Sequence, residues 1–374
     1  MSTELSLGQL SDSFQDLSVE TFLTGDQGWT SQQADLDQQV AENLSDEDLD
    51  ALSLSEYLLT SAQFQIEAYS SSTLVQKTSI FGLDAGLDFN VDVSQLPSGP
   101  LVVAKRVNLF TSLSRKNGST VSDLSRRIRK VLQEIRILKH PPFESCESII
   151  RLLGVSWEND NGDFTTPSLV FEYAELGTLR QYLSRPSSPL STTEKQLLGL
   201  QVGRALLVLH GCGVCHGDVK LDNVLIAGGP LGKPTAKLAD FGSSIIIRPK
   251  ESQRTYWGTQ VYNAPELRSD QDKQSGSTVS TSLMFACDIF SFGLLLYELI
   301  HDGIPYWKSH GTEEPTIGIT LKISSLEGCG DVGSEATTVA PLRQAVALCL
   351  KEQPEQRNDL VPILEMMTGE SEHL

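Results

Sequence analysis

The sequence predicts an α+β fold with two lobes, a small β-rich N-terminal lobe and a larger, mostly helical C-terminal lobe. Two observations support this prediction. Strand-like segments lie mainly before residue 173, whereas apolar segments with helical spacing dominate the second half of the chain. In addition, the almost entirely apolar residues 283–300 predict a buried helix in the larger lobe.

An acidic leader precedes the two lobes. Residues 1–76 contain 14 Asp and Glu and no Lys or Arg, whereas the rest of the 374-residue chain contains 34 acids and 29 bases. We expect residues 1–73 to form this leader, residues 74–366 the folded domain and residues 367–374 a short tail. Two interpretations of the leader stay open: it is disordered with transient amphipathic helices, one continuing toward Ala68, or it folds on a regulatory partner.

The smaller lobe is expected at residues 74–173. Its residue pattern predicts strands at 80–93, 101–109, 149–157 and 168–173. Between the second and third of these strands, apolar residues recur at helical spacing from Leu124 to Leu138, which predicts an amphipathic helix.

The larger lobe is expected at residues 174–366. Ser-Thr-Thr-Glu at 191–194 has the pattern of a capping box, which predicts a helix that begins there and ends near His210. Two short strands are expected beyond Asn223, and the last third of the chain is expected to be helical.

The composition argues against several classes of function. A formal charge of −19 disfavours nucleic acid and anionic membranes as partners, because phosphate contacts need clustered Lys and Arg. The N-terminus lacks the basic and apolar regions of a signal peptide, and residues 289–300 are too short to span a membrane. Six cysteines in a chain of this length predict reduced thiols. We therefore expect an intracellular protein, cytoplasmic or nuclear.

Residues 216–223, His-Gly-Asp-Val-Lys-Leu-Asp-Asn, carry the main chemical signal. Asp218 lies five residues before Asn223, and Asp240, in Asp-Phe-Gly, follows Asn223 by seventeen residues. Phosphoryl transfer to a hydroxyl group needs this combination. One carboxylate orients the hydroxyl, while an amide oxygen and a second carboxylate bind Mg²⁺.

With these motifs the chain resembles the eukaryotic protein kinase family, from about residue 76 to 366. Val-Val-Ala-Lys at 102–105 matches the family's nucleotide-lysine motif, and Glu134 lies where the family has the partner glutamate. The resemblance implies a bilobal protein-kinase-like fold. It also implies that Glu134 aims the Lys105 ammonium at the α- and β-phosphates of ATP.

Further matches lie in the larger lobe. Thr259, in Gly-Thr, and Glu266, in Ala-Pro-Glu, match the end of the family's activation segment. Asp288 matches the start of the family's central helix, and Arg357 matches the partner of the Ala-Pro-Glu glutamate. The resemblance therefore implies a buried, structural ion pair between Glu266 and Arg357.

The resemblance implies a serine/threonine protein kinase that phosphorylates protein substrates with ATP and Mg²⁺. Asp218 would accept the hydroxyl proton, Lys220 would neutralise the γ-phosphate, and Thr259 would position both side chains. Asn223 and Asp240 would bind Mg²⁺. The residues expected at the ATP site are Gly86, Val91, Val103, Lys105, Phe171, Glu172, Tyr173, Ala174 and Leu225.

The glycine-rich loop departs from the family pattern. When Val91 is aligned with the family's valine, Asp84, Gly86 and Phe89 stand at the three glycine positions. Because glycines let backbone amides approach phosphates closely, this departure predicts weaker ATP binding. Two alternatives therefore stay open. The chain is a pseudokinase that serves as a binding or scaffold module, or it is a small-molecule phosphotransferase, because some enzymes of that class share the His-Gly-Asp motif.

The catalytic loop also departs from the family pattern, because Gly217 replaces the usual arginine. In the family that arginine often binds a phosphate on the activation loop. We therefore expect activity to depend little on phosphorylation of Ser252 or Thr255.

The predicted helix that bears Glu134 opens with four basic residues, Arg126, Arg127, Arg129 and Lys130. Two interpretations stay open. These residues form a solvated basic face, or they bind the acidic leader, which would then control the position of the helix.

Overall fold

The computed structural model describes residues 57–70, 74–79, 89–107, 120–160, 164–185, 189–229, 233–248, 252–267, 277–309, 335–357 and 359–368. The described residues up to Ala174 belong to one compact unit, and those from Glu175 onward belong to a second. We call these the N-terminal unit and the C-terminal unit. The division lies next to the boundary expected between the two lobes.

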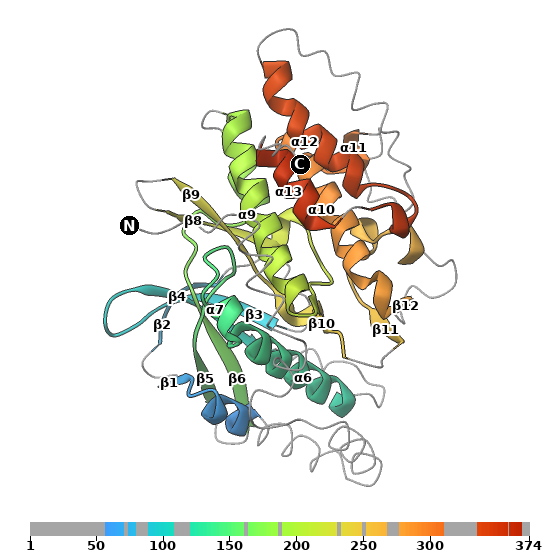
Figure 1. The fold of residues 1–374 in the computed structure, drawn as a ribbon. Helices are drawn as coiled ribbons and strands as arrows, with labels where there is room; N and C mark the ends of the chain where they lie inside the picture. Colours follow the sequence, from blue (N-terminus) through green and yellow to red (C-terminus); the bar gives the residue numbers. More distant parts are fainter. Residues whose placement is uncertain are drawn as a thin grey trace. The chain divides into compact units, whose positions relative to one another are not determined.

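The N-terminal unit is built on a six-stranded sheet with the strand order β1-β5-β6-β4-β3-β2 (Figure 1). Neighbouring strands are antiparallel, except for β1 and β5, which are parallel. Leu96, Val102 and Val170 form a buried apolar cluster in this unit. The strands are β1 (Glu67–Ser70), β2 (Val75–Ser79), β3 (Phe89–Gln95), β4 (Leu101–Val107), β5 (Leu152–Asp160) and β6 (Phe164–Glu172).

The last residues of the predicted leader belong to this unit. Residues 57–63 are helical, and the hydroxyl of the fully buried Tyr57 donates to the backbone oxygens of Ser156 (3.1 Å) and Ser168 (3.0 Å). The helix does not continue to Ala68 as expected. The chain turns at Gln65, which has a φ of 50°, and then forms β1. Because β1 pairs with β5, it supplies partners for backbone groups that would otherwise be left open on an edge strand.

The helix predicted in the smaller lobe is α6 (Thr120–Leu138), and the short α7 (Pro141–Glu144) follows it. Its buried apolar residues recur at intervals of three and four, as an amphipathic helix requires. The residues with this spacing are Ile128, Val131, Leu132, Ile135 and Leu138, and Ile137 is buried as well. Glu134 lies on the same buried side and is only 1% exposed. A charged side chain this deeply buried needs a partner.

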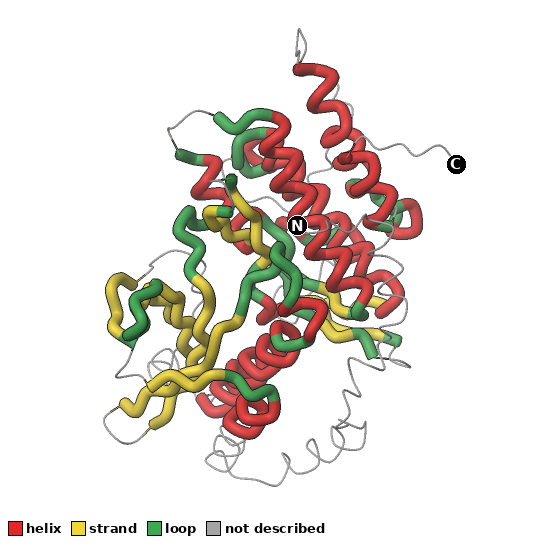
Figure 2. The backbone as a smooth tube through the Cα atoms, turned by 60° about the vertical axis from the view of Figure 1, so that its left-hand side comes forward, coloured by secondary structure: helices red, strands yellow, loops and turns green. Residues whose placement is uncertain are grey.

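Helices dominate the C-terminal unit (Figure 2). They are α8 (Leu179–Leu183), α9 (Thr192–Gly211), α10 (Met284–Ile300), α11 (Tyr306–Ser309), α12 (Glu335–Cys349) and α13 (Leu360–Thr368). The capping box predicted at the start of α9 is confirmed, because the Ser191 and Glu194 side chains each bond the other residue's backbone N–H. The predicted end near His210 is also confirmed.

Three short antiparallel strand pairs lie between these helices. The pairs are β7 (Val214–Cys215) with β10 (Ile245–Ile246), β8 (Val224–Gly228) with β9 (Pro234–Leu238), and β11 (Gln253–Tyr256) with β12 (Ser277–Ser280). The first two pairs bracket the residues of the predicted catalytic loop and the Asp-Phe-Gly motif.

The predicted core helix is α10. By length and composition, the stretch Thr281–Ile300 is the one described helix that could cross a membrane, but 78% of its most apolar window is buried inside the protein. Such burial is typical of the central helix of a folded domain. Cys212, Cys215, Cys287 and Cys349 are buried free thiols. Among the described residues no group of His, Cys, Asp and Glu could hold a metal ion by itself.

Several predictions fall on residues outside those that the structure describes. These are residues 1–56 and 71–73 of the leader, residues 80–88 with Asp84 and Gly86, residues 108–109, residues 369–374 of the tail, and the side chains of Leu124 and Arg126.

Candidate active site

The catalytic loop, residues 216–223, begins directly after β7 and is held by Asp288 near the start of α10. The Asp288 carboxylate accepts the backbone N–H groups of His216 (2.6 Å) and Gly217 (2.9 Å), and its Oδ2 lies 3.0 Å from His210 Nε2. Burial raises the pKa of Asp288, but the histidines and the Gly217 N–H outweigh burial and leave this pKa below its ordinary value. Asp288 therefore stays ionised and fixes the loop.

His216 joins the catalytic loop to the segment that carries Asp240. Its Nδ1 accepts the backbone N–H of Asp218 (3.3 Å), so Nε2 carries the proton and donates to the backbone oxygen of Ala239 (3.1 Å). The ring is fully buried and packs edge-on against Phe241, with 5.2 Å between ring centroids. These contacts fix the ring in place and give His216 a structural role.

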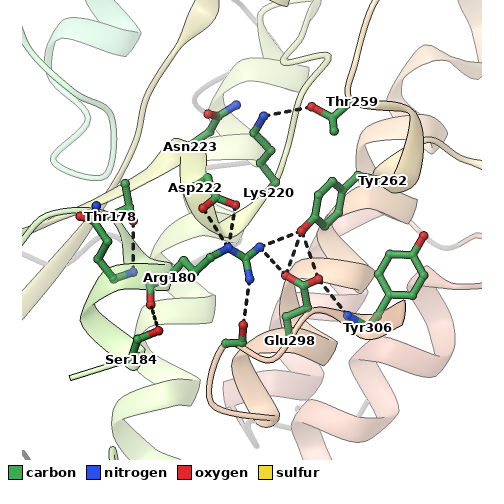
Figure 3. A network of polar contacts seen from close by, with 12 residues as sticks. Thr178, Arg180, Ser184, Lys220, Asp222, Asn223, Thr259, Tyr262, Glu298 and Tyr306 are labelled. Atoms are coloured by element: carbon green, nitrogen blue, oxygen red, sulfur yellow. Dashed lines mark hydrogen bonds and ion pairs between the residues drawn. The ribbon is translucent and has the colours of Figure 1, made fainter. Parts of the chain in front are cut away.

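Asp218, the expected base, is held by three groups. Its Oδ1 accepts the backbone N–H of Thr259 (2.9 Å), and its Oδ2 accepts the Asn223 side-chain amide (2.9 Å). Lys220 Nζ lies 3.1 Å from Asp218 Oδ2 and donates to Thr259 Oγ1 (2.9 Å; Figure 3). The structure therefore brings together Asp218, Lys220, Asn223 and Thr259.

The β8–β9 hairpin explains why Asn223 and Asp240 lie close together. Asn223 directly precedes β8, Asp240 follows β9 by two residues, and Val224 pairs with Leu238 at that end of the hairpin. The Ala239 N–H also donates to the Asn223 backbone oxygen (2.9 Å). Asp240 has a left-handed backbone (φ 62°), which costs about 1–3 kcal/mol in a non-glycine residue and is common at functional sites.

Lys105, on β4, and Glu134, on α6, form the expected ion pair in the N-terminal unit. Lys105 Nζ lies 3.0 Å from Glu134 Oε2 and 3.3 Å from Oε1. The Phe89 ring also contacts the ammonium, with 4.8 Å from Nζ to the ring centroid. Phe89 stands at an expected glycine position, so its ring is a feature of this site that the family pattern does not contain.

Val91, Val103, Phe171, Glu172 and Leu225, also expected at the ATP site, lie on strands, whereas Tyr173 and Ala174 directly follow β6. Val103 on β4 is paired with Phe171 on β6, and Val91 on β3 is paired with Lys105. Ala174 is buried, and the Glu172 carboxylate accepts the Arg151 backbone N–H (2.9 Å). Tyr173 also belongs to the N-terminal unit, whereas Leu225 lies on β8 of the C-terminal unit.

A second polar network supports the catalytic loop, and the sequence did not predict it (Figure 3). Arg180, on α8, donates from Nε to both carboxylate oxygens of Asp222 (2.8 Å each) and from Nη2 to the Tyr262 hydroxyl (2.7 Å). The same guanidinium donates to Glu298 Oε2 (2.9 Å) and to the Gly303 backbone oxygen (2.8 Å). The pKa of Arg180 is raised by Glu298, Tyr262 and Asp222, although burial alone would lower it.

Glu298 is the buried acid at the centre of this network. Its side chain is fully buried in α10 and accepts the Tyr262 hydroxyl (3.1 Å) and the Tyr306 N–H (3.1 Å) in addition to Arg180. Burial raises the pKa of Glu298 to about 7, because these donors offset only part of the loss of water. A charged residue inside an apolar helix was the one visible sign of this network in the sequence.

Replacing Glu298 by Gln should remove part of the pH dependence of stability. Between pH 4.5, the ordinary pKa, and about 7, the folded protein keeps the Glu298 proton that the unfolded chain has lost. Raising the pH through this window therefore lowers the free energy of unfolding, by at most about 1.4 kcal/mol per pH unit. Above this window the effect is constant. Chemical denaturation between pH 5 and 8 measures the slope.

The matched control is Glu365→Gln, which changes an exposed glutamate of α13. We expect the control to keep the slope of the unaltered protein and Glu298→Gln to show a shallower decrease with rising pH. Equal slopes in all three proteins would contradict a raised pKa of Glu298.

The ion pair between Glu266 and Arg357 is present. Arg357 Nη1 lies 2.6 Å from Glu266 Oε1, and Nη2 lies 2.9 Å from Oε2. The remaining Arg357 donors bind backbone oxygens, those of Lys351, Glu352 and Ala286. Because all five guanidinium N–H groups have acceptors, the buried charge is fully compensated.

Gly217 is required by the local backbone. Its φ is +81°, and a Cβ at this position would lie 2.4 Å from the backbone oxygen of Ser243. Gly258 packs against the same loop, since a Cβ there would lie 2.4 Å from the Gly217 backbone oxygen. An arginine would not fit at position 217 without a shift of the backbone.

Comparisons with known proteins agree with these observations. A family model described as a protein kinase domain matches residues 98–367. A probable serine/threonine-protein kinase of Dictyostelium discoideum is 30% identical over 179 residues, which are 48% of this chain and 26% of that protein. Mitogen-activated protein kinase kinase 9 of Arabidopsis thaliana is 30% identical over 204 residues, which are 54% of this chain and 58% of that protein. Aurora kinase of Encephalitozoon cuniculi is 29% identical over 184 residues, 49% of this chain and 58% of that protein. The alignments thus span less than two thirds of each of these relatives.

Proposed function

The chain belongs to the protein kinase family, and we propose from this premise that it transfers the γ-phosphoryl group of ATP to serine or threonine hydroxyl groups of protein substrates. The observation that carries the proposal is the Asp218 carboxylate, held by Thr259 and Asn223 beside the Lys220 ammonium. This arrangement fixes a base and a cation side by side. Such preorganised groups are the main source of catalysis in phosphoryl transfer.

In the proposed reaction the substrate hydroxyl donates its proton to Asp218. The hydroxyl oxygen forms a bond to the γ-phosphorus while the bond from that phosphorus to the β–γ bridging oxygen breaks, and ADP leaves. Lys220 neutralises charge on the transferred group. Thr259 keeps both side chains in place through its N–H and its hydroxyl.

Two pairs of residues are assigned to the nucleotide. Lys105, fixed by Glu134, binds the α- and β-phosphates. Asn223 and Asp240 are suited to hold Mg²⁺, because an amide oxygen and a carboxylate are ligands that this ion prefers. The Asn223 amide nitrogen donates to the backbone oxygen and to the carboxylate of Asp218. The amide oxygen of Asn223 therefore points away from Asp218. The bound ion would supply charge neutralisation at the phosphates.

The two alternatives are less well supported. The Phe89 ring favours a pseudokinase, because it lies next to the ammonium of Lys105, where the phosphates of ATP would bind. The intact Lys105–Glu134 pair and the ordered group around Asp218 favour an enzyme. An activation segment that ends in the Glu266–Arg357 ion pair favours a protein substrate over a small molecule.

The decisive experiment measures Mg·ATP binding by the full chain and then phosphate transfer to a generic Ser/Thr protein substrate. Binding with transfer to serine or threonine is the expected result. Binding without transfer, or no binding, would contradict the proposal and support the pseudokinase. Transfer to a small molecule such as choline, but not to protein, would also contradict it.

Replacing Lys105 by Met should lower kcat/KM for ATP by about 10²–10³-fold, the usual cost of losing one preorganised charge at a phosphoryl group. The matched control is Lys139→Met, which removes a lysine paired at 2.7 Å with the exposed Glu144. Steady-state kinetics with varied ATP measure both proteins. An unchanged kcat/KM in the Lys105 variant would exclude Lys105 from the nucleotide site.

A further inference from the structure

The activation segment is paired with a second strand of the C-terminal unit. β11, which contains Thr255, runs antiparallel to β12, and the registered pairs are Gln253–Ser280, Arg254–Val279, Thr255–Thr278 and Tyr256–Ser277 (Figure 1). The Thr281 N–H extends the pairing by donating to the Ser252 backbone oxygen (3.1 Å). β12 comes from the segment between Ala-Pro-Glu and α10, so two separate parts of the chain meet here.

The paired strand leads directly to the catalytic group. Tyr256, the last residue of β11, is 1% exposed, and its hydroxyl lies 3.5 Å from Asp288 Oδ1. Asp288 is the residue that fixes the start of the catalytic loop. Three residues after Tyr256, Thr259 binds Asp218 and Lys220. A displacement of β11 would therefore move supports on both sides of Asp218.

The catalytic loop has no arginine with which to hold a phosphate on this segment. Gly217 occupies that position and leaves no space for a side chain against Ser243. Gly258, two residues beyond β11, packs against the Gly217 backbone oxygen. The activation segment thus contacts the loop by close backbone packing, which needs glycine on both sides.

We propose that β12 is a positioning strand for the activation segment. Its backbone hydrogen bonds to β11 hold the segment in the conformation in which Thr259 supports Asp218. Thr278 and Val279 lie in the middle of this strand. Substitutions at these two positions can therefore disrupt its backbone hydrogen bonds to β11. The inference rests on the proposed function, because it assigns β12 a role in phosphoryl transfer.

The test breaks the backbone pairing of β12 in the full chain. The variant Thr278→Pro/Val279→Pro removes both central N–H groups, whichever of them faces β11. The matched control, Thr278→Ala/Val279→Ala, removes the same side chains and keeps both N–H groups. We expect the proline variant to lose about tenfold or more in kcat for a protein substrate, with an ATP KM within about twofold of the unaltered protein. The alanine control should stay within about threefold in kcat.

Amide hydrogen exchange supplies a readout that does not depend on activity. Alternate amides of residues 253–256 donate to β12. In the unaltered protein these amides should exchange at least about tenfold more slowly than in an unfolded chain, and the proline variant should lose this protection while α9 and α10 keep theirs. Fast exchange at all of residues 253–256 in the unaltered protein would overturn the proposal, even if the proline variant failed to fold. Unchanged kcat in the proline variant would also overturn it.

Phosphorylation is tested separately. Treatment of the unaltered protein with a protein phosphatase, and the variants Ser252→Ala and Thr255→Ala, should each leave kcat within about threefold. A large loss of activity in any of these would overturn the proposal, because the segment would then depend on a phosphate. If the unaltered protein transferred no phosphate at all, the proposed function would fail, and the exchange measurement would still decide whether β12 holds the segment.

Discussion

Replacing Asp218 by Asn is expected to lower kcat for protein phosphorylation by about 10²–10⁴-fold, the range of a lost general base. The amide cannot accept the hydroxyl proton. It also disturbs the site, because both carboxylate oxygens of Asp218 accept N–H groups, those of Thr259 and Asn223. An asparagine has one acceptor oxygen, so its own NH₂ group would face one of these donors. Nucleotide binding, which draws on Lys105 and Glu134, should stay within about threefold.

The matched control for this substitution is Asp302→Asn. Asp302 is half exposed and pairs with the mostly buried Lys195 at 2.7 Å, so the same chemical change there removes an ion pair that includes no member of the group around Asp218. Phosphate transfer to protein and the Kd of Mg·ATP are measured for both variants. If the Asp218 variant kept more than about a tenth of kcat, another group would have to accept the proton.

The residues proposed to be catalytic have a spacing that the sequence shows, because this spacing follows from a short, local structure. Asn223 and Asp240 flank a single β-hairpin, so a nearly fixed number of residues separates them. Asp218 and Lys220 lie in the loop directly before it, and Asn223 holds Asp218 from five residues away. Residues that come together through a short, local structure have a fixed spacing in the sequence, and this spacing does not depend on the rest of the fold.

The Arg180 network could not be predicted, because its members have no fixed spacing. Arg180, Asp222, Tyr262 and Glu298 come from four separate segments and meet only when the C-terminal unit has folded. A single arginine in a five-residue helix resembles any surface arginine. Glu298 did give a signal, since a charge inside an apolar helix requires a buried partner. That signal predicts that a partner exists, but not which residue it is.

Two of the strands that the sequence did not predict, β1 and β12, were missed for a related reason. β1 has four residues and lies in an acidic region whose composition is typical of disorder, and β12 has four residues rich in Ser and Thr. Each strand is stabilised by its partner, β5 or β11, rather than by its own pattern of apolar residues. Pairing with a distant strand overrides weak local preferences.

Replacing Arg357 by Met is expected to lower the free energy of unfolding by about 3–5 kcal/mol, because it leaves the Glu266 carboxylate largely buried without its cation. The side chain of Arg357 is fully buried, and that of Glu266 is 14% exposed. Three backbone oxygens, those of Lys351, Glu352 and Ala286, also lose their donor. For a unit of this size the loss corresponds to a decrease of Tm on the order of 10 °C. Chemical and thermal unfolding both measure it.

A double-mutant cycle separates the ion pair from the packing of the arginine. Glu266→Gln/Arg357→Met removes both charges, so it should be more stable than the sum of the two single changes predicts, by about 1–3 kcal/mol. The matched control is Arg151→Met, because Arg151 is 59% exposed and lies 3.7 Å from Glu172. The control should change the free energy of unfolding by less than about 1 kcal/mol. Strict additivity in the cycle would mean that Arg357 stabilises the protein through its backbone contacts and its packing on Phe290, and that the pairing of its charge with Glu266 contributes nothing.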